Sequence, residues 1–444
     1  MSNPFQLTFT LKQHTPIIHF QHDQDGATLR ATEVKPKLDR FILMKIGREA
    51  DPNLINENEI YDKGKEVANR KKWLIDSGKG ALDYKMRIEP IDAVNSIPIM
   101  YSTTNDGKFR PNFPTIFGNV DSHQKKVFRF AEKQKLTITC TKVELSDKFN
   151  QWIGMFFSLN NFGFRQSKGF GSFTIDNKSM VLGSKLFFTL NHGITEYYEV
   201  FRDIDLFYRC LKSGINIKTR EDPKDKKSKL IDKMYLKSLM FKFAKSLSKP
   251  EQWDKRTIRH ALFLNNYKYK DDKKEDGIFY NRRNPDGTVQ FTVAQAEGTN
   301  YFDFRDLLGL STEQDWLFYS SKIEKSVSKS IIKNGKDEKM QIERFASPLW
   351  FKPIYSEEAQ NWFIYLITNN IPPEYSGADV IVSNKTNHIA LTIYPTFDLN
   401  NFLKKSIKAF DKNDIEFGAG FAEENVPEAL ILSDIFTQLQ TQIG

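Results

Sequence analysis

Cysteine is scarce in this 444-residue chain, which contains only Cys140 and Cys210. Two cysteines so far apart in the sequence predict no disulfide framework, which fits a reducing cytoplasm. The sequence also has no apolar run of about 18 residues, the length that a bilayer-spanning helix needs. The first residues, MSNP, lead directly into a strand pattern, without the basic and apolar segments of a secretory signal. We therefore expect a cytoplasmic protein that does not enter a membrane.

Motifs of familiar catalytic chemistry are also missing. The chain has no Walker loop, no Cys-x-x-Cys pair, no His-Glu-x-x-His and no nucleophile elbow. His14, His19 and His22 cluster near the N-terminus, where a metal-independent ribonuclease can use a histidine as general base toward a ribose 2′-hydroxyl. The alternative is a polar surface or a hydrogen-bonded loop. Because the spacing supplies no fourth zinc ligand, we expect no metal and no cofactor.

Positive charge and aromatic side chains are present in excess. The 65 basic and 56 acidic residues give a net charge of +9 and a pI near 9.1, which favours a polyanionic partner. The 37 phenylalanines supply both core packing and faces on which bases can stack. The length predicts two or three domains, each able to bury its own core.

One segment, Asn161–Phe173, combines three glycines, two cations and an aromatic residue. It follows an apolar stretch typical of a buried helix and leads into the strand pattern Phe173–Ile175. Glycine lets a backbone approach a polyanion, cations neutralise phosphates, and a phenylalanine offers a stacking face. This glycine-rich loop is therefore predicted to touch RNA, with an ordinary hairpin loop as the alternative. The expected contacts are Arg165, Lys168, Gly169, Phe170 and Gly171.

A second basic segment, Leu29–Phe41, lies nearer the N-terminus. It is preceded by the strand pattern Phe5–Phe9 and by the segment Thr15–Ile18. Proline is favoured at the first position of a helix, and apolar residues follow Pro36 at helical spacing. The pattern predicts a helix that starts at Pro36, with Lys35 just outside it.

The two segments together resemble the RAMP superfamily, the repeat-associated proteins of CRISPR systems. The order strand, Thr-Pro, variable loop and Leu-Arg-x-Thr-x-x-Lys is similar to that of the first subunits of type III-B Cmr effectors. Ile116–Gly118, with the strand behind it, and Arg344–Leu349 are similar to further segments of that family. Two departures are Pro36, where the family usually has glycine, and Thr32, where it often has serine.

The resemblance implies an α+β fold of two tandem ferredoxin-like (RRM-like) modules with insertions, at residues 1–180 and 181–444. It implies a non-catalytic RNA-binding subunit that binds guide and target RNA near the 3′ end of the guide, beside other RAMP subunits, in antiviral defence. A metal-independent repeat endoribonuclease and a scaffold that barely touches nucleic acid are the alternatives. The residues expected to face the glycine-rich loop across a cleft are Arg30, Lys35, Lys37 and Arg40.

The segment Asp51–Ala81 interrupts the first module with mixed charge. It predicts an insertion that carries a basic helix or arm. The alternative is a solvated helix that Trp73 and Leu74 anchor. The sequence leaves open whether this insertion binds RNA or protein.

Two further patterns lie in the second half of the chain. Residues 219–249 predict a lysine-rich linker that enters an amphipathic helix at Leu230. The segments Asp379–Val382 and Ile389–Ile393 predict a closing hairpin, and a helix is expected to follow from Phe397 to Phe410.

Overall fold

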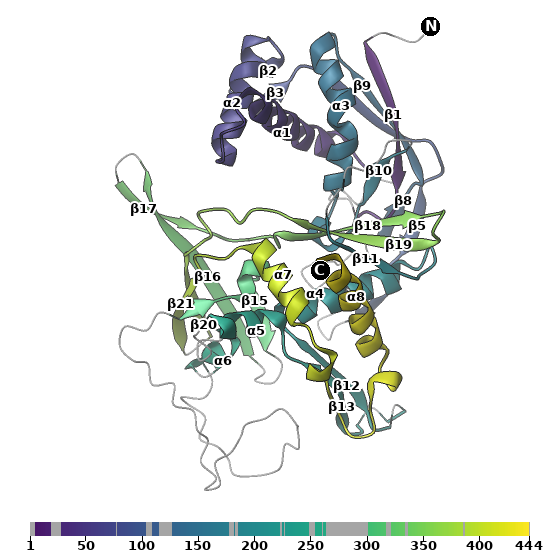
Figure 1. The fold of residues 1–444 in the computed structure, drawn as a ribbon, viewed down its shortest axis with the longest axis vertical. Helices are drawn as coiled ribbons and strands as arrows, with labels where there is room; N and C mark the ends of the chain where they lie inside the picture. The colour runs from purple at the N-terminus through teal and green to yellow at the C-terminus, as the bar shows by residue number, and fades with distance from the viewer. Residues whose placement is uncertain are drawn as a thin grey trace. The chain divides into compact units, whose positions relative to one another are not determined.

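The computed structural model describes residues 5–18, 28–76, 78–103, 109–114, 127–176, 182, 185–222, 224–225, 227–247, 254–259, 261–262, 301–316, 321–333, 336–384 and 387–443. This part of the chain mixes helices with several sheets, which confirms the expected α+β class (Figure 1). The chain divides into two compact units. Unit 1 comprises Met1–Arg202 and Trp350–Ile367, and unit 2 comprises Asp203–Leu349 and Thr368–Gly444. The domain boundary near residue 180 stays a prediction.

Unit 1 contains a four-stranded antiparallel sheet in the order β10-β1-β9-β4. In chain order its elements are β1 (Gln6–Gln13), α1 (Ala31–Ala50), β4 (Lys85–Pro90), β9 (Lys133–Thr139), α3 (Val143–Leu159) and β10 (Phe173–Ile175). Phe9 and Leu11 of β1 are buried at alternate positions, and Phe9 lies opposite Leu136 of β9. This two-residue period fixes which face of the sheet enters the core.

The core of unit 1 forms between this sheet and the helices α1 and α3. Both helices contribute apolar side chains at the three- and four-residue spacing of one helical face. The expected buried helix before the glycine-rich loop and the strand after it are confirmed as α3 and β10. The core side chains include Leu38, Ile42 and Ile46 of α1 and Phe149, Ile153 and Phe156 of α3.

The first helix begins earlier than the sequence predicts. Glu33 N and Val34 N both donate to Arg30 O, so α1 starts at Ala31. Lys35 and Pro36 therefore lie inside the helix, and the expectation that Lys35 precedes it is wrong. Proline lacks an N–H, so this exposed second-turn position gives up one helical hydrogen bond.

The helix α2 (Glu57–Arg70) lies within the predicted insertion and packs closely on α1. A Cβ atom on Gly64 would lie 1.9 Å from Leu43 O, and one on Gly47 would lie 1.9 Å from Ile60 O. Glycine at both positions therefore lets the two backbones touch. The helix has four acidic and three basic residues, so it is not the expected basic helix. Trp73 is buried in the core of unit 1 and anchors the segment.

In the described part of unit 1 there are also three short strand pairs and one small sheet. The pairs are β2 (Leu74–Asp76) with β3 (Ala81–Leu82), β5 (Asn95–Pro98) with β8 (Val127–Phe130), and β6 (Tyr101–Thr103) with β7 (Phe109–Pro111). The sheet has the order β11-β19-β18, with β11 (Phe187–Leu190), β19 (Asn361–Thr368) and β18 (Leu349–Ser356). Strands from near residue 360 thus complete a unit whose other elements come from the first 202 residues.

The described residues of unit 2 form two sheets. The first has the order β12-β13-β22, with β12 (Ile215–Arg220), β13 (Leu230–Leu236) and β22 (Glu416–Phe417). The second has the order β14-β21-β20-β16-β15, with β17 (Lys336–Gln341) beside β16. Its other strands are β14 (Phe302–Asp303), β15 (Glu313–Trp316), β16 (Ser321–Lys333), β20 (Asp379–Ser383) and β21 (His388–Ile393). The antiparallel pairing of β20 with β21 confirms the closing hairpin.

One predicted helix in unit 2 is instead a strand. The segment from Leu230 pairs with β12, where Ile215 lies opposite Leu236. Met234 and Leu236 are buried at alternate positions, which is the period of a strand. The helix begins only at Leu239, after Ser238, whose side chain caps its first turn.

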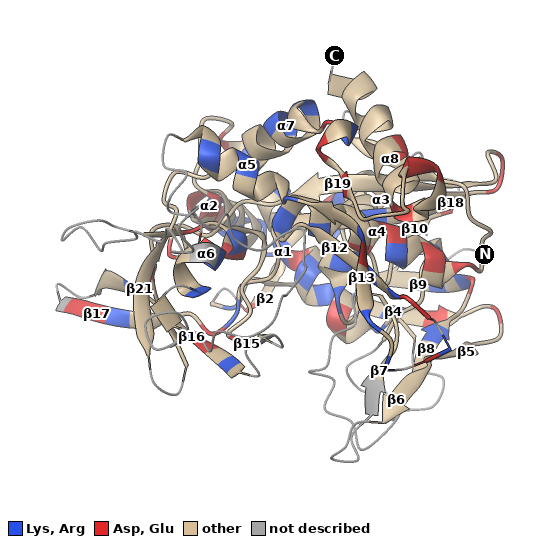
Figure 2. Cartoon of the chain, turned by 90° about the horizontal axis from the view of Figure 1, so that it is seen from below, with Lys and Arg blue, Asp and Glu red and all other residues tan. Residues whose placement is uncertain are grey.

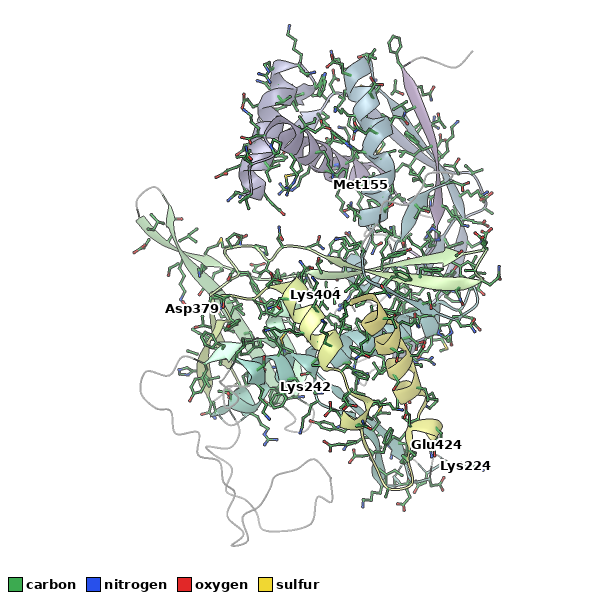
Figure 3. The ribbon with its side chains drawn as sticks, viewed as in Figure 1. Met155, Lys224, Lys242, Asp379, Lys404 and Glu424 are labelled. Carbon is green, nitrogen blue, oxygen red and sulfur yellow. The ribbon has the colours of Figure 1, made fainter. Side chains whose placement is uncertain are left out.

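The helices of unit 2 include α5 and α7, which pack against each other through Phe243 and Phe402, with ring centroids 5.4 Å apart. The helix expected after the closing hairpin is confirmed as α7. Figure 2 shows basic residues on both helices, and Figure 3 labels Lys242 on α5 and Lys404 on α7. The helices are α4 (Tyr197–Lys212, which begins in unit 1), α5 (Leu239–Ser246), α6 (Asp254–Arg259), α7 (Leu399–Ala409) and α8 (Pro427–Ile443).

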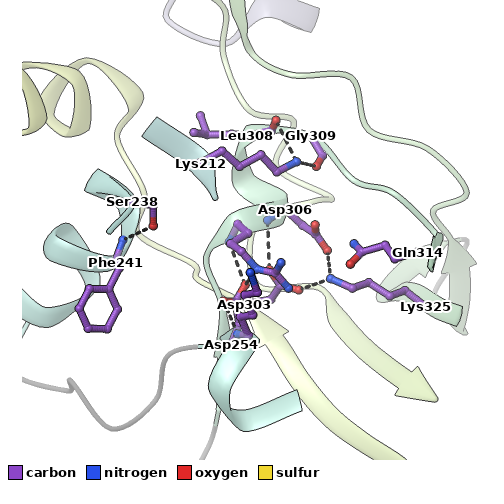
Figure 4. Close-up of polar contacts among 12 residues, drawn as sticks. Lys212, Ser238, Phe241, Asp254, Asp303, Asp306, Leu308, Gly309, Gln314 and Lys325 are labelled. Carbon is purple, nitrogen blue, oxygen red and sulfur yellow. Dashed lines mark hydrogen bonds and ion pairs between the residues drawn. The ribbon is translucent and has the colours of Figure 1, made fainter. Parts of the chain in front are cut away.

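Buried charges form the most unusual feature of the core of unit 2 (Figure 4). Lys325 Nζ lies 2.9 Å from Asp303 Oδ2 and 2.5 Å from Asp306 Oδ2. Arg305 Nε lies 3.0 Å from Asp254 Oδ2. Burial and the charge of Asp303 raise the pKa of Asp306. Each charge is compensated only by its neighbours, because these side chains are almost completely shielded from water.

Replacing Lys325 with methionine should destabilise unit 2 strongly, because two buried carboxylates lose their cation. We expect Lys325→Met to lower the free energy of unfolding by about 3 to 5 kcal/mol, measured by urea denaturation. Lys322→Met on the same strand is the control, since that lysine is exposed beside Glu313. Equal stability of the two variants would show that the buried lysine does not hold the carboxylates.

Placing a methyl group between α1 and α2 should separate the two helices. We expect Gly64→Ala to lower the free energy of unfolding by more than about 2 kcal/mol in urea, because the new Cβ overlaps a backbone carbonyl. Asp62→Ala, at an exposed position of α2, should stay within about 0.5 kcal/mol of the original chain. A neutral Gly64→Ala would contradict close backbone packing.

Candidate nucleic-acid interface

The glycine-rich loop has an unusual backbone. Gly163, Gly169 and Gly171 adopt φ angles of 79°, 99° and 64°. Arg165 also has a positive φ, 58°, which is uncommon for a residue with a Cβ atom. Such a conformation persists only where the surroundings impose it. The loop is therefore a fixed structure rather than a featureless hairpin.

The glycines are required by the packing of the loop itself. A Cβ atom on Gly171 would lie 2.0 Å from Phe162 O, and one on Gly169 would lie 2.8 Å from Pro353 Cγ. The sequence suggested that glycine lets the backbone approach a polyanion. The structure gives a different reason at these positions, because the space that a side chain would occupy is already filled by protein.

The Thr-Pro segment after β1 holds one end of the loop. Thr15 Oγ1 donates to Gly169 O at 2.7 Å and accepts from Ser172 N at 2.9 Å. Gly171 N donates to Pro16 O at 3.0 Å. One threonine hydroxyl thus satisfies two backbone groups of the loop, which accounts for the threonine of the Thr-Pro pair.

The first turns of α1 hold the other end. Glu33 Oε1 accepts from Gly163 N at 2.6 Å, and Lys37 Nζ donates to Gln166 Oε1 at 2.7 Å. Lys37 Nζ also lies 3.6 Å from Glu33 Oε1. Burial lowers the pKa of Lys37, and the Glu33 carboxylate opposes this shift. The two segments identified in the sequence therefore meet, with Lys37 as the predicted residue that joins them.

Lys35 lies on a different side of α1. Its Nζ is 2.9 Å from Asp39 Oδ2 and 2.9 Å from Leu82 O. The same ammonium lies 3.9 Å from the centroid of the Tyr84 ring. The structure thus uses Lys35 to attach α1 to the strands that follow α2, and it does not bring this residue to the loop.

Arg30, Arg40 and Arg165 retain more exposure. Arg30 precedes the first turn of α1 and is half-buried. Arg40 is exposed, with its guanidinium carbon 5.0 Å from the centroid of the Tyr61 ring. Arg165 is half-buried at its strained loop position, and its guanidinium carbon lies 5.2 Å from the centroid of the Phe164 ring. These three cations reach solvent at least in part.

Phe170 and Lys168 are more buried than the sequence suggested. Phe170 has no exposed surface and stacks on Phe201, with ring centroids 3.9 Å apart and an interplanar angle of 9°. Phe128 lies on the same aromatic cluster. The expected stacking face for RNA is therefore corrected to a core contact. Lys168 is 8% exposed and its ammonium is shielded from solvent.

Lys352 is a residue that the sequence interpretation missed. This lysine of β18 is 0% exposed, and its Nζ donates to Asn160 O and to Phe173 O, both at 2.8 Å. The two carbonyls flank the glycine-rich loop. Burial lowers the pKa of Lys352 far below its usual range. A lysine within the apolar run of Trp350, Phe351 and Ile354 was the available sequence signal.

His14 is the described member of the histidine cluster; His19 and His22 lie outside the described residues. Its Nε2 lies 2.8 Å from Thr174 Oγ1, and its Nδ1 accepts from Tyr355 N at 3.3 Å. Burial, with the nearby charge of Lys352, lowers the pKa of His14 to about 3. Both ring nitrogens are engaged away from solvent, so His14 is not placed to deprotonate an RNA hydroxyl.

No group of three His, Cys, Asp or Glu side chains in the described ranges is arranged to hold a metal ion. None of the helices in that part of the chain combines the length and hydrophobicity needed to cross a membrane. The expected Phe-Gly segment at Ile116–Gly118 lies outside the described residues.

Comparison with known families identifies the chain. The Cmr1 N-terminal domain matches residues 4–215, and the Cmr1 C-terminal domain matches residues 235–426. A search of curated proteins returned no match. The two matches define a RAMP subunit of a type III-B CRISPR complex. The chain belongs to the Cmr1 family, which confirms the resemblance seen in the sequence.

The buried imidazole of His14 predicts a specific acid sensitivity. Its folded pKa lies below the unfolded value, so the unfolded chain binds the extra proton and stability falls as pH drops from about 6.5 toward 3. When the pH is lowered from 7 to 5, this group should reduce the free energy of unfolding by about 2 kcal/mol.

The measurement is urea denaturation at both pH values. His14→Gln should remove this part of the pH dependence, whereas His388→Gln, at an exposed position, should retain it. Identical pH dependence in the original chain and in His14→Gln would contradict a neutral buried histidine.

Proposed function

We propose that the chain is a non-catalytic RNA-binding subunit of a type III-B complex and binds guide and target RNA near the 3′ end of the guide. Other RAMP subunits are its expected neighbours in antiviral defence. The observation that carries the proposal is the contact of Glu33 and Lys37 with the glycine-rich loop. The two segments that carry the family resemblance are joined by these hydrogen bonds, which would preorganise a binding surface.

The topology of unit 1 supports this proposal. Its succession of β1, α1, β4, β9, α3 and β10, in the sheet order β10-β1-β9-β4, is that of a split βαβ or ferredoxin-like module. RRM modules, which share this arrangement, are common platforms for single-stranded RNA. We therefore propose a ferredoxin-like module in unit 1, and the tandem second module at residues 181–444 stays a prediction.

The nine residues expected at the interface divide by their contacts. We propose Arg30, Arg40 and Arg165 as the phosphate-binding cations, because Arg40 is exposed and the other two side chains are only partly buried. Lys37, Gly169 and Gly171 shape the loop, and Lys35 fixes the neighbouring strands. Phe170 and Lys168 support the loop from within.

The metal-independent endoribonuclease has less support. A general base must reach the hydroxyl proton that it removes. His14 is buried, and its neutral ring already engages Thr174 and Tyr355. The proposal of a non-catalytic subunit follows from this engagement together with the family, and cleavage of RNA in chelator would overturn it.

Affinity for single-stranded RNA, measured with the full-length chain across a series of salt concentrations, tests the proposed interface. Arg40→Ala and Arg165→Ala should each reduce the slope of log affinity against log salt by about 0.7, because each removes one phosphate contact. Lys224→Ala removes the same charge from an exposed turn of unit 2 and should leave the slope unchanged. Unchanged slopes in both arginine variants would contradict an RNA interface at these residues of unit 1.

A further inference from the structure

Unit 2 contains a cavity that the proposed interface does not use. Its volume is about 280 Å³, and it lies beside the first turn of α7 and the chain segment that follows β19. Most of the side chains around it are polar or aromatic. They include Thr368, Asn369, Tyr394, Phe397, Asp398 and Asn400.

The polar groups of the cavity present both donors and acceptors. Thr368 Oγ1 donates to Asn400 Oδ1 at 2.9 Å, which directs the amide nitrogen of Asn400 to act as a donor. Asp398 Oδ1 accepts from Asn401 N at 2.8 Å, and a carboxylate has a second oxygen that can accept. An amide and a carboxylate together match the amino and carbonyl groups on a nucleobase edge. A phosphate would instead be repelled by Asp398.

The aromatic walls of the cavity are held in place by other rings. Tyr394 stacks on Phe304, with ring centroids 4.9 Å apart and an interplanar angle of 27°. Phe397 packs edge-on against Phe243 of α5, at 5.8 Å and 88°. Rings that are fixed in this way lose little conformational entropy when a flat ligand binds against them.

Positive charge lies next to the cavity, along α7. Asn400 is followed at intervals of four residues by Lys404 and Lys408, so the three side chains share one exposed helical face. The helices α5 and α7 together carry five lysines and no acidic residue. Figure 2 shows basic residues on α5 and α7, and Figure 3 labels Lys242 and Lys404 among them. A ligand whose base enters the cavity would meet cations beside it.

We propose that this cavity binds one base of single-stranded RNA, with Lys404 and Lys408 holding phosphates of the adjoining nucleotides. The inference rests on the proposed RNA-binding function and adds a second point of contact, in unit 2. An acidic protein segment would match the lysines, but its carboxylates would be repelled by Asp398 in the cavity. The combination of a base-sized cavity, fixed aromatic rings and flanking cations favours RNA.

Charge and base recognition can be tested separately with the full-length chain and a fluorescent single-stranded RNA. Lys404→Ala and Lys408→Ala should each reduce the salt slope by about 0.7. Asn400→Leu should weaken binding about tenfold and leave the slope unchanged, because it removes a base contact without changing charge. Lys224→Ala is the charge-matched control, since Figure 3 places it in unit 2 away from Lys404.

Photocrosslinking with RNA that contains 4-thiouridine supplies a second measurement that does not depend on affinity. We expect a crosslinked peptide that includes Tyr394 or Phe397, and we expect its loss in Asn400→Leu. The inference is overturned if the lysine variants match Lys224→Ala in slope and no crosslink maps to this cavity. A chain that binds RNA through Arg40 and Arg165 alone would preserve the proposed function and overturn only this inference, whereas a chain that binds no RNA would overturn both.

Discussion

The shape of the glycine-rich loop depends on one buried lysine. Lys352 Nζ donates to Asn160 O and to Phe173 O, so one side chain links the backbone at the two ends of the loop. A buried carbonyl without a donor costs about 1 to 3 kcal/mol, and Lys352 supplies donors to two of them. Within this closed frame, Asn161 Nδ2 donates to Gln166 O and Phe351 O, and Thr15 bonds Gly169. The positive φ angles inside the loop are sustained by these contacts.

Local patterns in the sequence predicted elements whose own residues decide their structure. Helix α3, strand β10, the β20–β21 hairpin and helix α7 follow from apolar spacing, and the structure contains all four. For the segment from Leu230 to Leu236 the same reasoning predicted a helix where the structure has a strand. Seven residues with several apolar side chains fit a helix or a strand equally well. Its pairing with β12 decides the outcome. A tertiary contact of this kind is not encoded in local periodicity.

The candidate site was predictable in its residues but not in their roles. Composition correctly marked the glycine-rich loop as unusual, yet it could not show that Phe170 would stack on Phe201 rather than face solvent. Nor could it separate Lys37, which reaches the loop, from Lys35, which contacts Leu82 on a different side of the same helix. Lys352 lies about 180 positions after the loop that it closes, and local sequence patterns do not report contacts over such separations.

Net charge alone does not identify a binding partner, because some of the cations are buried in the protein. A formal charge of +9 favours a polyanionic partner, but several of the cations are buried. Lys325 and Arg305 form ion pairs with carboxylates, and Lys352 donates hydrogen bonds to backbone carbonyls. In unit 2, Lys325 and Arg305 are paired with Asp254, Asp303 and Asp306, so these two cations are offset inside the protein and are not available to a partner. Attraction to a nucleic acid must instead arise where exposed cations are not balanced locally. The exposed lysines of α7, a helix without acidic residues, meet that condition, and so does the exposed guanidinium of Arg40. Burial and local balance, rather than the total count of basic residues, therefore determine which surfaces can bind RNA.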